Sequence, residues 1–109
     1  MKERSLMLLL KKKKGFFLAI LDLTETEFSL SSDQLADVLQ QKKTLLSCIE
    51  KIDHQIKEFW HSFTPILPQD IQNELEDIRK VILQILSADK KNYMLRKKEL
   101  GIYEQKQYM

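Results

Sequence analysis

Residues that break or constrain a chain are scarce in this sequence. Its 109 residues include two glycines, two prolines and one cysteine. So few turn-forming residues exclude a turn-rich all-β fold and disorder of the Pro/Gly-rich kind. A single cysteine cannot form an internal disulfide, which suits a reducing compartment. The length predicts one helical domain over residues 1–109, built from a Leu-, Lys- and Glu-rich composition typical of helices and coiled coils.

Long apolar runs are also missing. The longest, Phe16 to Leu21, is far shorter than the roughly 20 residues that a membrane-spanning helix requires. Together with the preceding Lys11 to Lys14 it imitates a signal peptide, but Asp22 ends the run and no small-residue cleavage pattern follows. We therefore expect no transmembrane segment and a cytoplasmic location.

Acidic and basic residues are segregated along the chain, although they nearly cancel to a net charge of +2. Residues 22–40 carry five acidic groups and no basic one, whereas the chain from Lys80 onward carries seven basic groups and three acidic ones. Blocks of opposite sign can determine how helices pair. We expect the basic C-terminal block to lie near the acidic residues 22–40.

Apolar residues recur at helical spacing along most of the chain, which predicts an all-α fold. We expect three helices, at about residues 2–30, 32–63 and 69–100. Pro65 and Pro68 separate the second helix from the third, because proline cannot continue a helix interior. The predicted architecture is an elongated antiparallel bundle, in which the second and third helices form a coiled-coil hairpin and the first packs along them.

The second segment has the most regular pattern. Its apolar residues repeat every 3.5 residues from Leu35 to Phe63, and only Lys42 breaks the seam. Ser31 followed by Gln34 predicts a capping box before it. In the third segment, Asn92 falls on a seam position, which predicts weaker packing toward the C-terminus.

The two ends of the chain are expected to be the least ordered. Lys11 to Lys14 and Gly15 interrupt the apolar stripes of the first segment, so residues 1–14 are interpreted as a frayed basic arm. Residues 104–109 are interpreted as a disordered tail. The lysine run suits a solvated turn, an acidic partner or membrane surface, or nucleic acid.

Patterns that carry catalytic or metal chemistry are missing. His54 and His61 lie about 10 Å apart along one helix, too far for one metal ion, and Cys48 has no zinc-site spacing. Two distant glycines exclude a phosphate-binding loop. Small helical mutases that rearrange dicarboxylates need converging arginines, and the three arginines here lie outside apolar runs. We expect no enzyme activity, no cofactor and no catalytic or metal-binding residue.

Contact with another protein is the function that the pattern favours. The first segment has a broad apolar face, and a partner helix would bind such a face through anchors at helical spacing. The residues expected to line a partner-binding groove on this face are Leu9, Leu10, Phe16, Phe17, Ile20 and Leu21. Trp60 is a candidate anchor at the end of the second segment. Burial within the chain, or a homodimer, would cover the same face.

Three motifs suggest a family. Residues 21–27 read L-x-L-T-E-x-E, residues 43–53 read K-x-L-L-x-x-I-x-x-I-D, and residues 92–95 read N-x-x-L. In this order they resemble the FlgN/FliT type of flagellar and type III export chaperones over about residues 16–103.

The resemblance implies a small cytoplasmic helical protein without enzymatic activity. It would hold a helical segment of an export substrate in an apolar groove, keep it soluble and deliver it to the export gate, with Tyr103 as the residue that could match the family's docking tyrosine. Two alternatives remain: a structural coiled-coil component or regulator of a secretion ATPase, and a basic-patch binder of nucleic acid or membrane surfaces.

Overall fold

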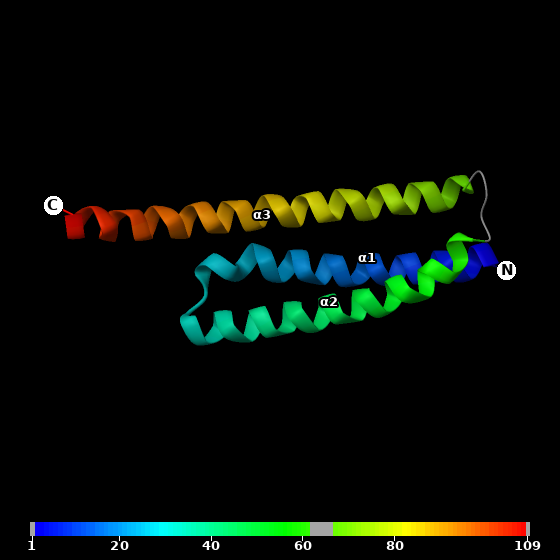
Figure 1. Ribbon diagram of the computed structural model, residues 1–109, viewed down its shortest axis with the longest axis horizontal. Coiled ribbons are helices and arrows are strands. Elements are labelled where there is room, and N and C mark those ends of the chain that lie inside the picture. Colours follow the sequence, from blue (N-terminus) through cyan, green and yellow to red (C-terminus); the bar gives the residue numbers. More distant parts are fainter. Residues whose placement is uncertain (1, 62–66, 109) are drawn as a thin grey trace.

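The computed structural model describes the backbone of residues 2–61 and 67–108, and the side chains of residues 3–61 and 67–96. Its elements are α1 (Lys2–Thr26), the short 3-10 helix η1 (Glu27–Ser29), α2 (Ser32–Trp60) and α3 (Gln69–Tyr108). These described residues contain no strand, and the molecule measures 65 × 25 × 18 Å (Figure 1). The predicted all-α, elongated fold is confirmed.

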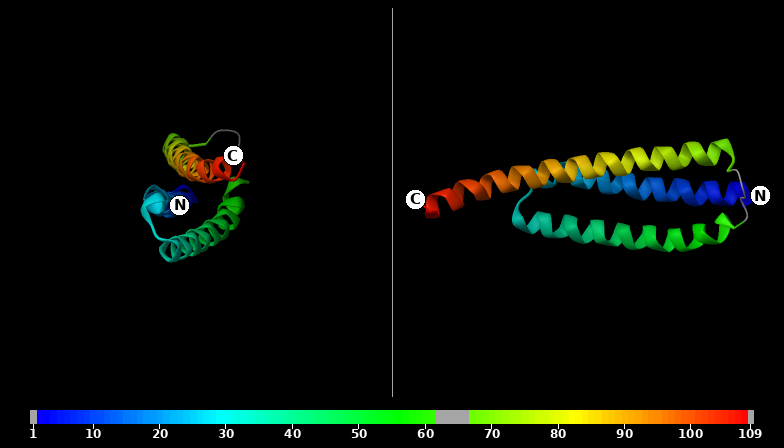
Figure 2. Two further views of the ribbon diagram at one scale, coloured as in Figure 1. Left: turned by 90° about the vertical axis from the view of Figure 1, so that its left-hand side faces the viewer. Right: turned by 45° about the horizontal axis from the view of Figure 1, so that its top comes forward.

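The first helix, rather than the hairpin of the other two, is the centre of the bundle. α1 packs along both α2 and α3, whereas the backbones of α2 and α3 hardly approach each other. The end-on view in Figure 2 shows α2 and α3 on different sides of α1. α2 and α3 run antiparallel as predicted, and the broad apolar face of α1 provides the surface that both helices cover.

Two apolar clusters follow one another along α1. In the first, Leu6 and Leu10 are fully buried against α2 and α3. In the second, Ile20 is packed between Ile49 of α2 and Val81 of α3. Burial of a side chain of this size contributes about 1.5–3 kcal/mol to folding. The further buried members of the two clusters are Ile52, Ile56, Ile71, Ile78 and Ile85.

Residues 2–14 form the first half of α1 instead of the expected frayed arm. Leu6 and Leu10 anchor them in the core. The lysine run is divided by helix geometry, since successive residues point about 100° apart. Lys13 Nζ lies 2.6 Å from Asp53 Oδ1 on α2, and Lys14 Nζ lies 2.8 Å from Glu74 Oε1 on α3. The run therefore links α1 to both of its neighbours.

The capping box predicted at the start of α2 is confirmed. The backbone N–H of Gln34 donates to Ser31 Oγ at 3.3 Å, and the N–H of Ser31 donates to Gln34 Oε1 at 3.1 Å. At the other end α2 extends to Trp60, and Phe63 lies outside the described residues. α3 continues to Tyr108, beyond the predicted end at residue 100 and through most of the expected tail at 104–109.

Gly15 offers a direct test of the continuous α1. The residue is exposed, and an added Cβ would meet no atom within 4 Å. Gly15→Ala should therefore raise the free energy of unfolding by about 1 kcal/mol, because glycine is the poorer helix former. Ala36→Gly in the exposed part of α2 should have the opposite effect, and thermal denaturation would measure both. A destabilising Gly15→Ala would contradict a helix through this position.

Lys14 provides a pH-dependent test. The hydrogen bond to the Glu74 carboxylate is the main cause that raises the pKa of Lys14 above its ordinary value of 10.5. A folded-state pKa above the unfolded one stabilises the fold below the unfolded pKa, and this contribution is lost as the pH rises through the folded pKa. Lys14→Gln should thus be less stable than wild type in urea denaturation at neutral pH, with a smaller difference above pH 10.5. The exposed Lys12→Gln is the control, and an undiminished difference for Lys14→Gln would count against the pair.

Candidate functional site: an open groove between α2 and α3

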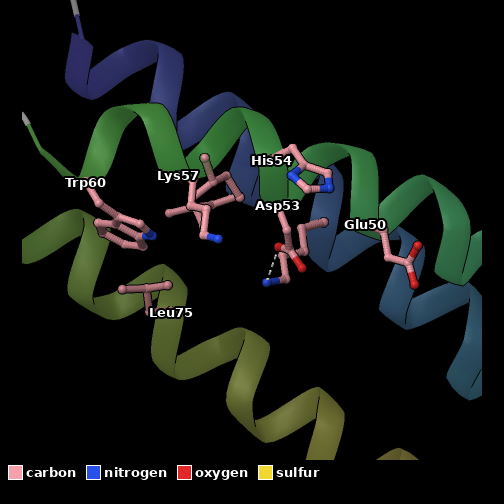
Figure 3. Close-up of a pocket in the computed structure, with 9 residues that line it drawn as sticks. Glu50, Asp53, His54, Lys57, Trp60 and Leu75 are labelled. Atoms are coloured by element: carbon pink, nitrogen blue, oxygen red, sulfur yellow. Dashed lines mark ion pairs between the residues drawn. The ribbon is translucent and has the colours of Figure 1, made fainter.

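The backbones of α2 and α3 stay apart along one side of the molecule, and we call this side the α2–α3 groove. Near Trp60 it deepens into a cavity of about 330 Å³. Figure 3 shows Trp60 on α2 and Leu75 on α3 on opposite sides of this opening. Leu10 of α1 and Ile56 of α2, both core residues, line it as well. The groove thus reaches the apolar interior of the bundle.

The rim of this cavity is polar. Glu50, Asp53, His54 and Lys57 project from successive turns of α2, as Figure 3 shows. Asp53 is held by Lys13, which crosses from α1. An apolar floor with a polar rim is the arrangement of most protein sites that bind another molecule.

The α2 wall continues as an apolar stripe beyond the cavity. Leu39 and Leu46 precede Asp53 and Trp60 at intervals of seven residues, so all four share one face of the helix. Asp53 and Trp60 line the cavity, which places the other two on the groove side. Leu39 and Leu46 are 49% and 48% exposed.

The α3 wall carries a matching stripe. Leu86 and Tyr93 follow Leu75 by 11 and 18 residues, which is about three and five helical turns, so they lie on the same flank. Leu86 and Tyr93 are 57% and 63% exposed. Because α2 and α3 run antiparallel, the two stripes accompany each other for about 27 Å.

A buried ionic cluster joins the three helices at the far end of the groove. Glu27 of η1, only 4% exposed, lies 2.5 Å from Lys42 Nζ of α2 and 3.7 Å from Arg96 Nη2 of α3. Asn92 Nδ2 donates to the Thr24 carbonyl at 2.8 Å and lies 3.5 Å from Glu27 Oε2. The polar residues Lys42 and Asn92, which interrupt the apolar seams in the sequence, thus satisfy a buried carboxylate.

The same cluster fixes the width of the groove. Lys42 Nζ also lies 3.5 Å from Asp89 Oδ1 on α3, so one lysine bridges α2 to α3 through Glu27 and Asp89. Arg96, from the basic C-terminal block, reaches Glu27 in the acidic block as expected, whereas the contact of Lys42 was not predicted. Two walls held apart by α1 and by fixed ion pairs form a preorganised surface, which reduces the entropy lost on binding.

Most of the predicted α1 contact residues are covered within the chain. Leu10 and Ile20 are buried in the core, and only Leu10 also lines the cavity. The half-buried side chains that pack against the clusters are Leu9, Phe16, Phe17 and Leu21. Trp60 lies in the groove, whereas the side chain of Tyr103 lies outside the described residues.

Sequence reasoning missed the residues of the groove walls. Leu39 and Leu46 widen the heptad stripe of α2 on one side, and this widening was the available signal for them. Leu86 lies off the seven-residue seam of α3, which is a weak signal because a single leucine beside a seam often widens a core face. Its exposure follows from the separation of α2 and α3, which the local pattern does not encode.

Comparison with known proteins adds no family. No protein-family model matches the chain, and neither curated proteins nor solved structures give a match. Among the described residues, no group of three or more His, Cys, Asp or Glu is placed to hold a metal ion. Across residues 2–61 and 67–108, no helix has the length and apolar character needed to cross a membrane.

Glu27→Gln tests whether the cluster holds the helices together. The change removes the carboxylate that compensates Lys42, whose side chain is 14% exposed, so we expect a loss of about 3 kcal/mol in the free energy of unfolding. Adding Lys42→Met should restore part of this loss, because the uncompensated charge is then gone. Urea denaturation would measure both, and Arg79→Ala, which breaks an exposed ion pair, should change little. An unchanged stability of Glu27→Gln would contradict a central role for this carboxylate.

Proposed function

We propose that this protein is a helical binding module that receives an amphipathic helix of a partner protein in the α2–α3 groove. The observation that carries the proposal is the separation of the α2 and α3 backbones, which leaves a cavity at Trp60 and exposed leucines along both helices on that side. Three packed helices with one open side leave the position that a fourth helix occupies in a four-helix bundle.

The groove suits a helix better than an extended chain or a small molecule. Both walls are helices whose backbone groups are already hydrogen-bonded, so an extended peptide could form no backbone hydrogen bonds along them. The exposed leucines recur along the walls over about 27 Å, roughly the length of an 18-residue helix. A partner helix would place residues at i, i+3, i+4 and i+7 between them.

The more specific role that we propose is that of an export chaperone for a secretion substrate. It rests on the resemblance of residues 21–27, 43–53 and 92–95 to the FlgN/FliT type of chaperone. The bound helix would be protected from aggregation, because its apolar face is covered, and would be released at the export gate. In this proposal the protein acts in the cytoplasm, by contact and without catalysis.

Trp60 supplies a built-in reporter for the test. It is the only tryptophan of the chain and lines the groove, so its fluorescence emission should shift to shorter wavelength when a helix covers it. We expect peptides of terminal helical segments of export substrates from the same organism to cause this shift. Each full-length substrate should stay soluble in a one-to-one complex.

A matched pair of variants locates the binding surface. Leu46 in the groove and Leu18 on the outer side of α1 are 48% and 46% exposed, so aspartate at either position perturbs the fold similarly. Leu46→Asp should weaken peptide binding about tenfold or more, because a charge replaces an apolar contact, and Leu18→Asp should bind like wild type. Titrations monitored through Trp60 would measure both. Equal binding by the two variants would remove the groove as the site.

A further inference from the structure

The charges along the groove point to the chemistry of its occupant. Resting on the binding role proposed above, we infer that the groove selects an amphipathic helix whose apolar stripe is bordered by acidic residues. The inference comes from which rim charges are already paired within the chain and which remain for a partner.

Most acidic groups beside the groove are already engaged. Asp53 is paired with Lys13 at 2.6 Å, and Asp89 lies 3.5 Å from Lys42. Farther out on α3, Glu76 is paired with Arg79 at 3.0 Å, and this pair keeps the pKa of Glu76 below its ordinary value. Glu50 remains as an acidic rim residue outside the ion pairs of the described side chains.

Three lysines beside the groove form no ion pair with the described residues. On α2, Lys43 and Lys57 lie seven residues to either side of Glu50 and are exposed. Figure 3 shows Lys57 between Trp60 and Asp53 at the cavity. On α3, the exposed Lys90 lies between Leu86 and Tyr93 along the stripe. Within residues 3–61 and 67–96, none of these three lysines belongs to an ion pair.

The rim that faces a partner is therefore basic, with three lysines against one glutamate. A helix with acidic residues beside its apolar stripe would meet these lysines, whereas a basic helix would meet like charge at each of them. Exposed pairs of this kind contribute little singly, but three together correspond to a preference of about tenfold. The apolar stripe supplies the affinity and the lysines supply the selection.

Two matched 18-residue peptides would test this inference. Both carry the same leucine stripe, with glutamates beside it in one and lysines in the other, and binding to the full chain is followed through Trp60. We expect the acidic peptide to bind about ten times more tightly at low salt, with the preference shrinking as salt screens the charges. A third peptide, with the acidic composition but a scrambled stripe, should not bind.

A charge-reversed protein sharpens the test. The variant Lys43→Glu/Lys57→Glu/Lys90→Glu should prefer the basic peptide. The control Lys12→Glu/Lys51→Glu/Lys80→Glu changes net charge equally at exposed positions off the groove and should keep the acidic preference.

The possible results separate this inference from the binding role itself. Binding of both stripe peptides with equal affinity, or better binding of the basic one, would overturn the charge selection and leave the groove as a helix-binding site. Absence of any response to either stripe peptide would overturn both. Equal binding of the scrambled peptide would show a general anion surface and overturn the selection. A dimer in sedimentation that Leu46→Asp dissociates would assign the groove to a second copy, which also overturns it.

Discussion

The burial of α1 between two helices whose backbones stay apart is the constraint on which the rest of the molecule depends. Leu6, Leu10 and Ile20 are covered from both sides, so neither α2 nor α3 needs the other to complete the core. A three-helix arrangement of this kind cannot close its third side. The groove is the direct consequence of where the apolar surface of α1 lies.

The ion pairs and hydrogen bonds of Glu27 add a specificity to the bundle that apolar packing alone does not provide. A buried carboxylate is costly unless it is paired and hydrogen-bonded, and Glu27 meets partners from both α2 and α3. Sliding one helix by a turn would carry Lys42 or Asn92 away from it. The apolar clusters tolerate such a shift better than the ionic cluster does, because leucine and isoleucine contacts lack direction. We therefore infer that the contacts of Glu27 fix the lengthwise alignment of the three helices.

The helices and the start of α2 could be predicted from the sequence because they depend on local patterns. The heptad from Leu35 onward and the Ser31–Gln34 capping box are signals contained within a few turns. Which helix lies between the other two could not be predicted, because the apolar stripes of α1 are interrupted in the sequence. Lys13 stands on the buried face of α1 and breaks its stripe, yet its amine reaches outward to Asp53. The pattern therefore suggested a frayed arm where the central helix begins.

Only part of the groove could be predicted, because some of its residues are marked by their type and others only by the packing of distant helices. Trp60 was predicted as a contact residue because aromatic side chains are favoured at binding surfaces, whereas Leu86 became visible only once α2 and α3 were seen apart. Exposure of a leucine is a property of its neighbours in space. The seven-residue series Ile71, Ile78, Ile85 and Asn92 marks Ile85 as a core position, but it does not show what lies beside Leu86.

The central position of α1 has a consequence for synthesis. α1 is made before α2 and α3, but much of its cover comes from α3, which is made after both. The hydrogen bond from Asn92 to Thr24 joins residues 68 positions apart, so it cannot form until the chain has emerged past Asn92. Until then Leu6 and Ile20 have only α2 to pack against, and the nascent chain exposes the kind of apolar surface that promotes aggregation. A molecule proposed to shield the helices of others thus passes through a stage in which its own α1 is only partly covered.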